Sequence, residues 1–116
     1  MNFVDAIKTG FDNYVRFSGR AARSEYWFWT LFVIVANVIA AIVDALLGLG
    51  FIEAIISLGL FLPGIAVSIR RLHDIDRTGW WLLIAFTGVG LIVLLVFDCI
   101  KGTTGPNRFG PDPLGI

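Results

Sequence analysis

The sequence predicts an all-α integral membrane protein with three transmembrane helices, a short amphipathic interfacial helix before them, and an irregular Gly/Pro-rich C-terminal tail. Hydrophobic residues make up 57% of the 116 residues and charged residues only 16%. Soluble proteins carry about 25% charged residues, and a soluble domain this small exposes too much surface to hide so many apolar side chains. Three nearly uncharged runs approach the length that a bilayer requires. We expect residues 1–116 to form a single membrane domain.

The first element covers residues 2–17, where apolar side chains recur at helical spacing and charged ones occupy the other face. The segment is too short and too charged to cross a membrane, so we expect a helix that lies in the interface. The alternative is an amphipathic helix that packs on its own protein. Because the charges are interspersed, the segment does not resemble a cleavable signal peptide.

Three apolar runs predict the transmembrane helices, at residues 24–47, 51–70 and 79–97. Aromatic residues at the start of the first run suit the aromatic belt of a membrane interface. Asn37, near the middle of that run, is typical of an interhelical hydrogen bond rather than of catalysis.

The second run contains Pro63, so we expect a kink near residues 61–64. Such a break is tolerated where neighbouring helices or polar side chains satisfy the carbonyl groups that it frees. The kink could form a binding site, as in some transporters, or serve packing alone. Residues 98–116 are too rich in glycine and proline for a regular helix and should form turns and extended chain.

The basic residues indicate an orientation. They precede the first run and lie between the second and third, whereas the connection between the first two has none and the tail has only Lys101 and Arg108. The positive-inside rule then puts the N-terminus and the turn around residues 70–78 in the cytoplasm, with the tail outside. The formal net charge at pH 7 is zero, and we expect no nucleic-acid partner.

The candidate functional residues form a charged cluster at the predicted cytoplasmic face. They are Arg20, Arg23, Glu25, Arg70, Arg71, His73, Asp74, Asp76, Arg77, Trp80 and Trp81. Arginine–carboxylate pairs among them would clamp the helix ends, and any unpaired arginine would favour an anionic lipid phosphate. The plainest alternative is a solvated turn that fixes the topology.

The run His73-Asp74-x-Asp76 invites an acid–base or metal interpretation. However, the chain has one histidine and one cysteine, and the predicted topology puts Cys99 across the membrane from His73. We therefore expect no catalytic, metal or cofactor site and no enzymatic activity. The polar residues within the runs are too few and scattered for a convincing pore; they are Thr30, Asn37, Ser57, Ser68 and Thr87.

Two function classes remain. The first is a non-enzymatic membrane module whose arginine-rich cytoplasmic face contacts lipid head groups or a partner protein. The alternative is a subunit of an oligomeric transporter or channel for ions or small solutes. The expected partners are membrane lipids, together with further copies of the chain or other membrane proteins.

Three blocks of the sequence also resemble a known family. They read Phe17-x-Gly19-Arg20-x-x-Arg23-x-Glu25-Tyr26-Trp27, Arg70-Arg71-Leu72-His73-Asp74-x-x-Arg77-x-Gly79-Trp80-Trp81 and Gly102-Thr103-x-Gly105-x-Asn107-Arg108-Phe109-Gly110-Pro111-Asp112-Pro113. Together they resemble the YhaH-like family of small bacterial inner-membrane proteins, catalogued as domain of unknown function 805. The resemblance covers nearly the whole chain. It implies a bacterial inner-membrane location and three spans, and it brings no established reaction, substrate or catalytic residue.

Overall fold

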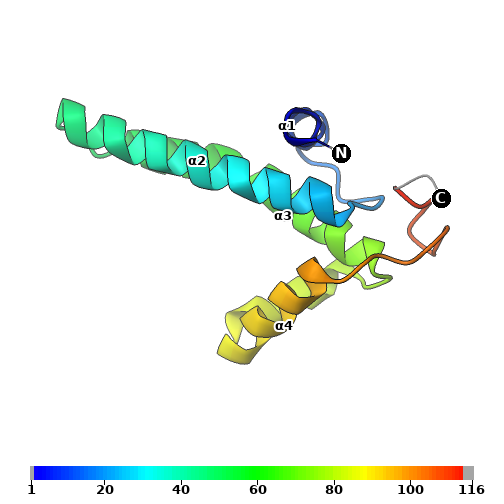
Figure 1. The fold of residues 1–116 in the computed structure, drawn as a ribbon. Helices are drawn as coiled ribbons and strands as arrows, with labels where there is room; N and C mark the ends of the chain where they lie inside the picture. The colour runs from blue at the N-terminus through cyan, green and yellow to red at the C-terminus, as the bar shows by residue number, and fades with distance from the viewer. Residues whose placement is uncertain (1, 114–116) are drawn as a thin grey trace.

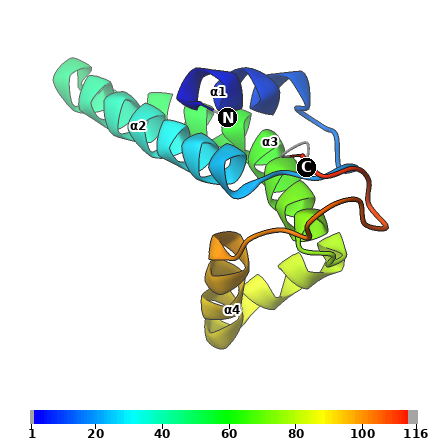
Figure 2. The same cartoon turned by 45° about the vertical axis from the view of Figure 1, so that its right-hand side comes forward.

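The structure is a computed structural model that describes residues 2–113. Its elements are α1 (Phe3–Asp12), α2 (Arg23–Leu47), α3 (Ile52–Asp74), the 3-10 helix η1 (Gly79–Phe86) and α4 (Gly88–Cys99). Helices α2 and α3 form a long antiparallel pair, α1 lies against both, and η1 and α4 form a shorter second arm (Figures 1 and 2). The predicted all-α class is confirmed.

Helices α2 and α3 have the properties of membrane helices. They contain 25 and 23 residues, with mean hydropathies of 2.4 and 2.1 over their most apolar windows. At 1.5 Å per residue they extend about 37 and 34 Å, more than the roughly 30 Å hydrocarbon core of a bilayer. Only 11% and 17% of those windows is buried within the protein. Apolar side chains that the protein itself leaves uncovered indicate that lipid surrounds the pair.

The connection between α2 and α3 is capped at both ends. Gly48 ends α2 in the left-handed region, with φ of 68°, where a residue without Cβ is unstrained. The Asp44 carboxylate accepts hydrogen bonds of 3.0 Å from the backbone N–H groups of Ile52 and Glu53. These bonds satisfy the orphan donors at the start of α3. Further along the pair, Ser57 Oγ donates to Asn37 Oδ1 at 2.7 Å, which confirms the predicted interhelical role of Asn37.

Helix α1 packs on the protein itself, as the alternative interpretation of its amphipathic pattern required. Phe11 meets Trp29 edge to face with a centroid separation of 5.4 Å. Gly10 makes this approach feasible, because a Cβ there would overlap the Trp29 ring. The helix ends at Asp12 rather than at residue 17. The Asn13 side chain donates to Thr9 O at 2.8 Å and ends the helix in a turn.

Pro63 does not interrupt α3, which continues from Ile52 to Asp74. Proline lacks an N–H group, so the carbonyl four residues earlier, at Gly59, loses its usual helical donor. The hydroxyl group of Tyr14 donates to Gly59 O and replaces that donor. Because a neighbouring segment satisfies the freed carbonyl, Pro63 serves packing, and the structure has no broken helix there that would form a binding site.

The prediction of one transmembrane helix over residues 79–97 is wrong. This run forms η1 and α4, which meet at Thr87 and pack against each other. The 3-10 helix η1 is about 16 Å long at 2.0 Å per residue, and α4 is about 18 Å long at 1.5 Å per residue. Each of the two helices is therefore only about half as long as a bilayer core is thick. Thr87 Oγ1 donates to Ile84 O at 2.8 Å and accepts from Gly90 N–H at 2.9 Å, which closes the tip. A Cβ at Gly90 would overlap Ile84 O, so this close approach requires glycine.

The helical hairpin formed by η1 and α4 returns the chain to the end of α3. Residues 100–113 therefore lie beside the start of α2 and the end of α3 (Figure 2). The expectation that the tail lies on the opposite side of the membrane from the turn around residues 70–78 is corrected. Its premise was a third span, and the apolar run reverses direction instead.

The role of Tyr14 can be tested with a double-mutant cycle. Tyr14→Phe should lower the free energy of unfolding by about 1 kcal/mol, because Gly59 O loses its donor. In a Pro63→Ala background the same substitution should cost clearly less, since the restored backbone N–H donates to Gly59 O. Thermal or denaturant unfolding in detergent measures both. Equal costs in the two backgrounds would contradict the assignment of Tyr14 as the substitute donor.

Candidate functional site

The candidate site lies where α2 begins, α3 ends and the C-terminal tail crosses between them (Figure 1). The three sequence blocks meet here although they are far apart in the chain. Gly19 turns the first block with φ of 92°, and Ala21 N–H then donates to Arg70 O at 2.9 Å. This bond fixes residues 19–21 along the last turn of α3 and places Arg20 in the interior.

Asp74 is the centre of the site. Its Oδ1 lies 3.1 Å from Arg20 and its Oδ2 lies 2.8 Å from Arg71. The three side chains are between 0% and 5% exposed. Buried charges of this kind are tolerated only when they are paired and hydrogen-bonded. One carboxylate therefore joins the α3 end to the segment that precedes α2.

Arg71 extends the network to α4. Its guanidinium donates to the backbone carbonyl groups of Phe97, Asp98 and Ile100. The last carbonyl groups of a helix lack intrahelical donors and carry the negative end of the helix dipole. Arg71 thus supplies donors to the free carbonyl groups at the end of α4, and the Asp74 carboxylate compensates the positive charge of Arg71.

Arg20 extends the network to the tail. Its guanidinium donates to Gly105 O at 2.7 Å and to the carbonyl groups of Thr103 and Gly110. Thr103 N–H in turn donates to Asp74 O at 2.7 Å. Gly102 permits this docking, because a Cβ there would overlap the Asp74 carboxylate. The irregular tail is consequently held through its own backbone carbonyl and N–H groups, which bond to Arg20 and to Asp74 O.

A second buried ion pair joins the two long helices directly. Arg70 Nη1 lies 2.8 Å from Glu25 Oε1, and both side chains are 4% exposed. Glu25 is in the first turn of α2, where the helix dipole favours a negative charge. Arg70 Nε and Nη2 have no hydrogen-bond partner among the described residues.

His73 is occupied by structural contacts. Its Nδ1 lies 2.8 Å from Gly19 O, an acceptor, which requires Nδ1 to carry the proton. The imidazole ring stacks on Phe109 with centroids 4.0 Å apart, and His73 O accepts from the Asn107 side chain at 2.9 Å. Cys99 lies at this same end of the protein, beside Arg23, whose guanidinium donates to its carbonyl. The expected separation of Cys99 and His73 across the membrane is therefore corrected.

The remaining predicted residues lie at the surface of the cluster. Asp76 pairs with Arg108 at 3.2 Å, with both side chains about half exposed. The Arg77 guanidinium lies over the Trp81 ring at 5.1 Å, and Trp80 is 77% exposed. Arg23 is also exposed, as is Lys101 of the tail. The structure thus divides the candidate residues into a buried, paired group and an exposed group.

A pocket of about 320 Å³ lies beside the exposed group, lined by Ala22, Arg23, Ser24, Asp74, Lys101 and Gly102. Ala22 occupies the N-cap position of α2 and has no side-chain oxygen to cap the helix.

Asp98 lies near the end of α4, where its backbone carbonyl accepts a hydrogen bond from Trp27 Nε1 at 3.0 Å. Burial raises the pKa of the Asp98 carboxyl to about 6.

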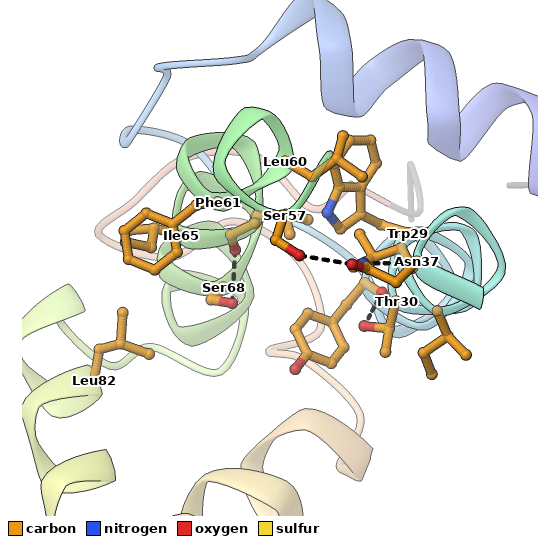
Figure 3. Close-up of a pocket in the computed structure, with 14 residues that line it drawn as sticks. Trp29, Thr30, Asn37, Ser57, Leu60, Phe61, Ile65, Ser68 and Leu82 are labelled. Atoms are coloured by element: carbon orange, nitrogen blue, oxygen red, sulfur yellow. Dashed lines mark hydrogen bonds between the residues drawn. The ribbon is translucent and has the colours of Figure 1, made fainter. Parts of the chain in front are cut away.

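The sequence analysis missed two parts of the site. The first is the tail, whose Asn107 and Phe109 hold His73; these residues belong to the third family block, which was their only signal. The second is an interhelical pocket of about 410 Å³ between α2 and α3, shown in Figure 3. Four residues that looked scattered in the sequence line it together: Thr30, Asn37, Ser57 and Ser68.

These features define a class of protein: a small integral membrane protein with long lipid-exposed helices and one densely charged end, where most of the charged side chains form ion pairs with one another. The profile of the family described as "Protein of unknown function (DUF805)" matches residues 14–111. The chain belongs to this family.

Two relatives from Escherichia coli (strain K12) are similar over most of their length. Inner membrane protein YhaI is 48% identical over 104 residues, which are 87% of this chain and 88% of the relative. Inner membrane protein YhaH is 44% identical over 108 residues, which are 87% of this chain and 89% of the relative. No solved structure matches the chain. Like these relatives, the chain is an inner-membrane protein.

The division between buried and exposed arginines predicts unequal effects of substitution. Arg71→Gln should lower the free energy of unfolding by about 3–5 kcal/mol, because it leaves Asp74 partly uncompensated and removes donors from the end of α4. Arg108→Gln breaks an exposed pair and should cost less than about 1 kcal/mol. Denaturant unfolding in detergent compares the two variants. Similar small losses would show that the cluster is solvated.

Proposed function

We propose that the chain is a non-enzymatic membrane module that binds anionic lipid head groups with the exposed cations at its charged end. The observation that carries this proposal is the division of the basic residues. Arg20, Arg70 and Arg71 are buried in ion pairs and serve the fold. Arg23 and Lys101 are exposed and line one pocket. We therefore assign lipid binding to Arg23 and Lys101, at the edge of the charged cluster, rather than to the double arginine Arg70-Arg71.

The pocket beside Arg23 and Lys101 has the chemistry of a phosphate site. Two cations line it, and so does the start of α2, which has no side-chain cap for its first-turn N–H groups. Asp74 also lines it, but two guanidinium groups already offset that charge. Each basic residue near an anionic membrane surface contributes about 1 kcal/mol.

The same end supports an orientation. The hairpin formed by η1 and α4 brings Lys101 and Arg108 to the side of the other basic blocks, whereas the α2–α3 connection carries Asp44 and Glu53 and no basic residue. The positive-inside rule then applies without exceptions in the tail. We infer two spans, a re-entrant hairpin, and both ends of the chain in the cytoplasm.

Cysteine labelling tests this orientation. In a Cys99→Ser background, Gly50→Cys places a thiol between α2 and α3, and Thr104→Cys places one in the tail. Both sites are exposed. A membrane-impermeant maleimide added to spheroplasts should label Gly50→Cys at once and Thr104→Cys only after the membrane is opened. Labelling of both sites in sealed spheroplasts would favour three spans, and labelling of Thr104→Cys alone would reverse the orientation.

Lipid retention tests the head-group proposal. Arg23→Gln and Lys101→Gln should each weaken the preference for phosphatidylglycerol over phosphatidylethanolamine by about fivefold, the equivalent of about 1 kcal/mol per charge. Native mass spectrometry of the protein released from mixed nanodiscs measures this preference. Lys8→Gln, which removes an exposed cation from α1, is the matched control. An unchanged preference in the Arg23/Lys101 double variant would exclude this pocket as the head-group site.

A further inference from the structure

The indole N–H of Trp29 is a buried donor without an acceptor. Trp29 is 2% exposed, and its Nε1 has no hydrogen-bond partner among the described residues. A buried tryptophan N–H normally finds a partner, since an unsatisfied buried donor costs about 1–3 kcal/mol. Trp29 lines the interhelical pocket, and Figure 3 shows its indole nitrogen on the side that faces α3.

Gly64 of α3 lies opposite this nitrogen and presents no side chain to it. A Cβ at Gly64 would lie 4.0 Å from Trp29 Nε1, so any larger side chain at that position would extend toward the indole edge. At position 64, the side chain that faces the donor is therefore a hydrogen atom.

Four other polar side chains of the pocket already form hydrogen bonds within the protein. Thr30 Oγ1 donates to Tyr26 O at 2.9 Å, and Ser68 Oγ donates to Gly64 O at 2.8 Å. Ser57 Oγ donates to Asn37 Oδ1, and Asn37 Nδ2 donates one of its two hydrogens to Val33 O. No charged residue lines the pocket. A ligand here must thus be uncharged where it meets Trp29 and must offer an acceptor.

The rest of the pocket is apolar and reaches the surface that faces lipid. Its walls include Val33, Leu60 and Ile65. Ile34 and Phe61 also line it and are 55% and 62% exposed. A hydrocarbon chain can therefore enter between them from the membrane. The volume of about 410 Å³ lies within the roughly 300–1,000 Å³ of small-molecule sites.

The depth of Trp29 suits an acyl carbonyl. Trp29 lies six residues after the exposed Arg23, which is about 9 Å along α2 at 1.5 Å per residue. The polar interfacial layer of a bilayer is about 5–8 Å thick on each side. Lipid ester carbonyl groups lie at the inner boundary of that layer, so the Trp29 donor lies close to their level.

We propose that this pocket binds one acyl chain of a membrane lipid, whose carbonyl oxygen accepts a hydrogen bond from Trp29 Nε1. The acyl chain of the lipid continues between α2 and α3 along Val33 and Leu60 toward the Asn37–Ser57 pair. The site is independent of head-group charge and does not rest on the phosphate pocket. The carbonyl belongs to a phospholipid ester or to the protonated carboxyl group of a free fatty acid, and the experiment separates these sources.

Two variants test the site by native mass spectrometry, with palmitoyl-oleoyl phosphatidylethanolamine and oleic acid offered in separate nanodisc preparations. Trp29→Phe keeps an aromatic ring and removes the donor; it should reduce retention of one bound lipid at least fivefold. Gly64→Leu fills the space before the indole and should abolish retention. Gly59→Leu adds the same side chain to α3 where a Cβ meets nothing within 4 Å, and it should retain the lipid.

Retention of the phospholipid identifies an ester carbonyl, and retention of oleic acid alone identifies a free acid. Equal retention by the wild type, Trp29→Phe and Gly64→Leu would overturn the proposal, as would a retained compound without an acyl chain. Trp29→Phe should leave the preference for phosphatidylglycerol over phosphatidylethanolamine unchanged, so failure of the phosphate site and failure of this site are distinguishable.

A second measurement does not depend on the folding of any variant. The indole ¹H–¹⁵N resonance of Trp29 in the wild-type protein should move downfield when the retained lipid is added to delipidated protein in detergent, because the N–H group gains an acceptor. An unmoved resonance at saturating lipid would contradict the proposed hydrogen bond.

Discussion

The ion pairs of Asp74 with Arg20 and Arg71 are the constraint on which the rest of the structure depends. Removing an ion from water costs several kcal/mol, and a buried pair offsets that cost only when its remaining donors and acceptors are also satisfied. Here the additional partners are backbone carbonyl groups of α4 and of the tail. The buried charges therefore require segments that are distant in the sequence to meet at one end of the protein.

This requirement explains why the last apolar run forms a hairpin. The guanidinium of Arg71 donates to carbonyl groups at the end of α4, so α4 must finish beside the end of α3. Thr87 and Gly90 supply a tip in which polar backbone groups are satisfied locally, as a turn at membrane depth requires. Gly102 then lets the tail cross the Asp74 carboxylate. The charge network and the small residues thus determine the topology together.

The sequence predicted what hydropathy and period determine. The first two spans agree with α2 and α3 to within a few residues at each end, and Asn37 forms its expected interhelical bond. Hydropathy could not distinguish one long helix from a helical hairpin, because the run of residues 79–97 is apolar in either case. Composition likewise suggested a charged cluster but not its pairing. Thr30 and Asn37 looked unrelated to Ser57 and Ser68 because their convergence on one pocket depends on how two antiparallel helices pack.

Hydrogen exchange of the tail tests the central claim most directly. The network holds Thr103 N–H on Asp74 O and docks the surrounding segment through Arg20. In nanodiscs, the wild-type amide groups of residues 102–110 should exchange slowly, and Asp74→Asn should increase their exchange at least tenfold while α2 and α3 remain protected. Rapid exchange of these amides in the wild-type protein, or no change in Asp74→Asn, would contradict the claim that the buried Asp74 network holds the tail to the helical pair.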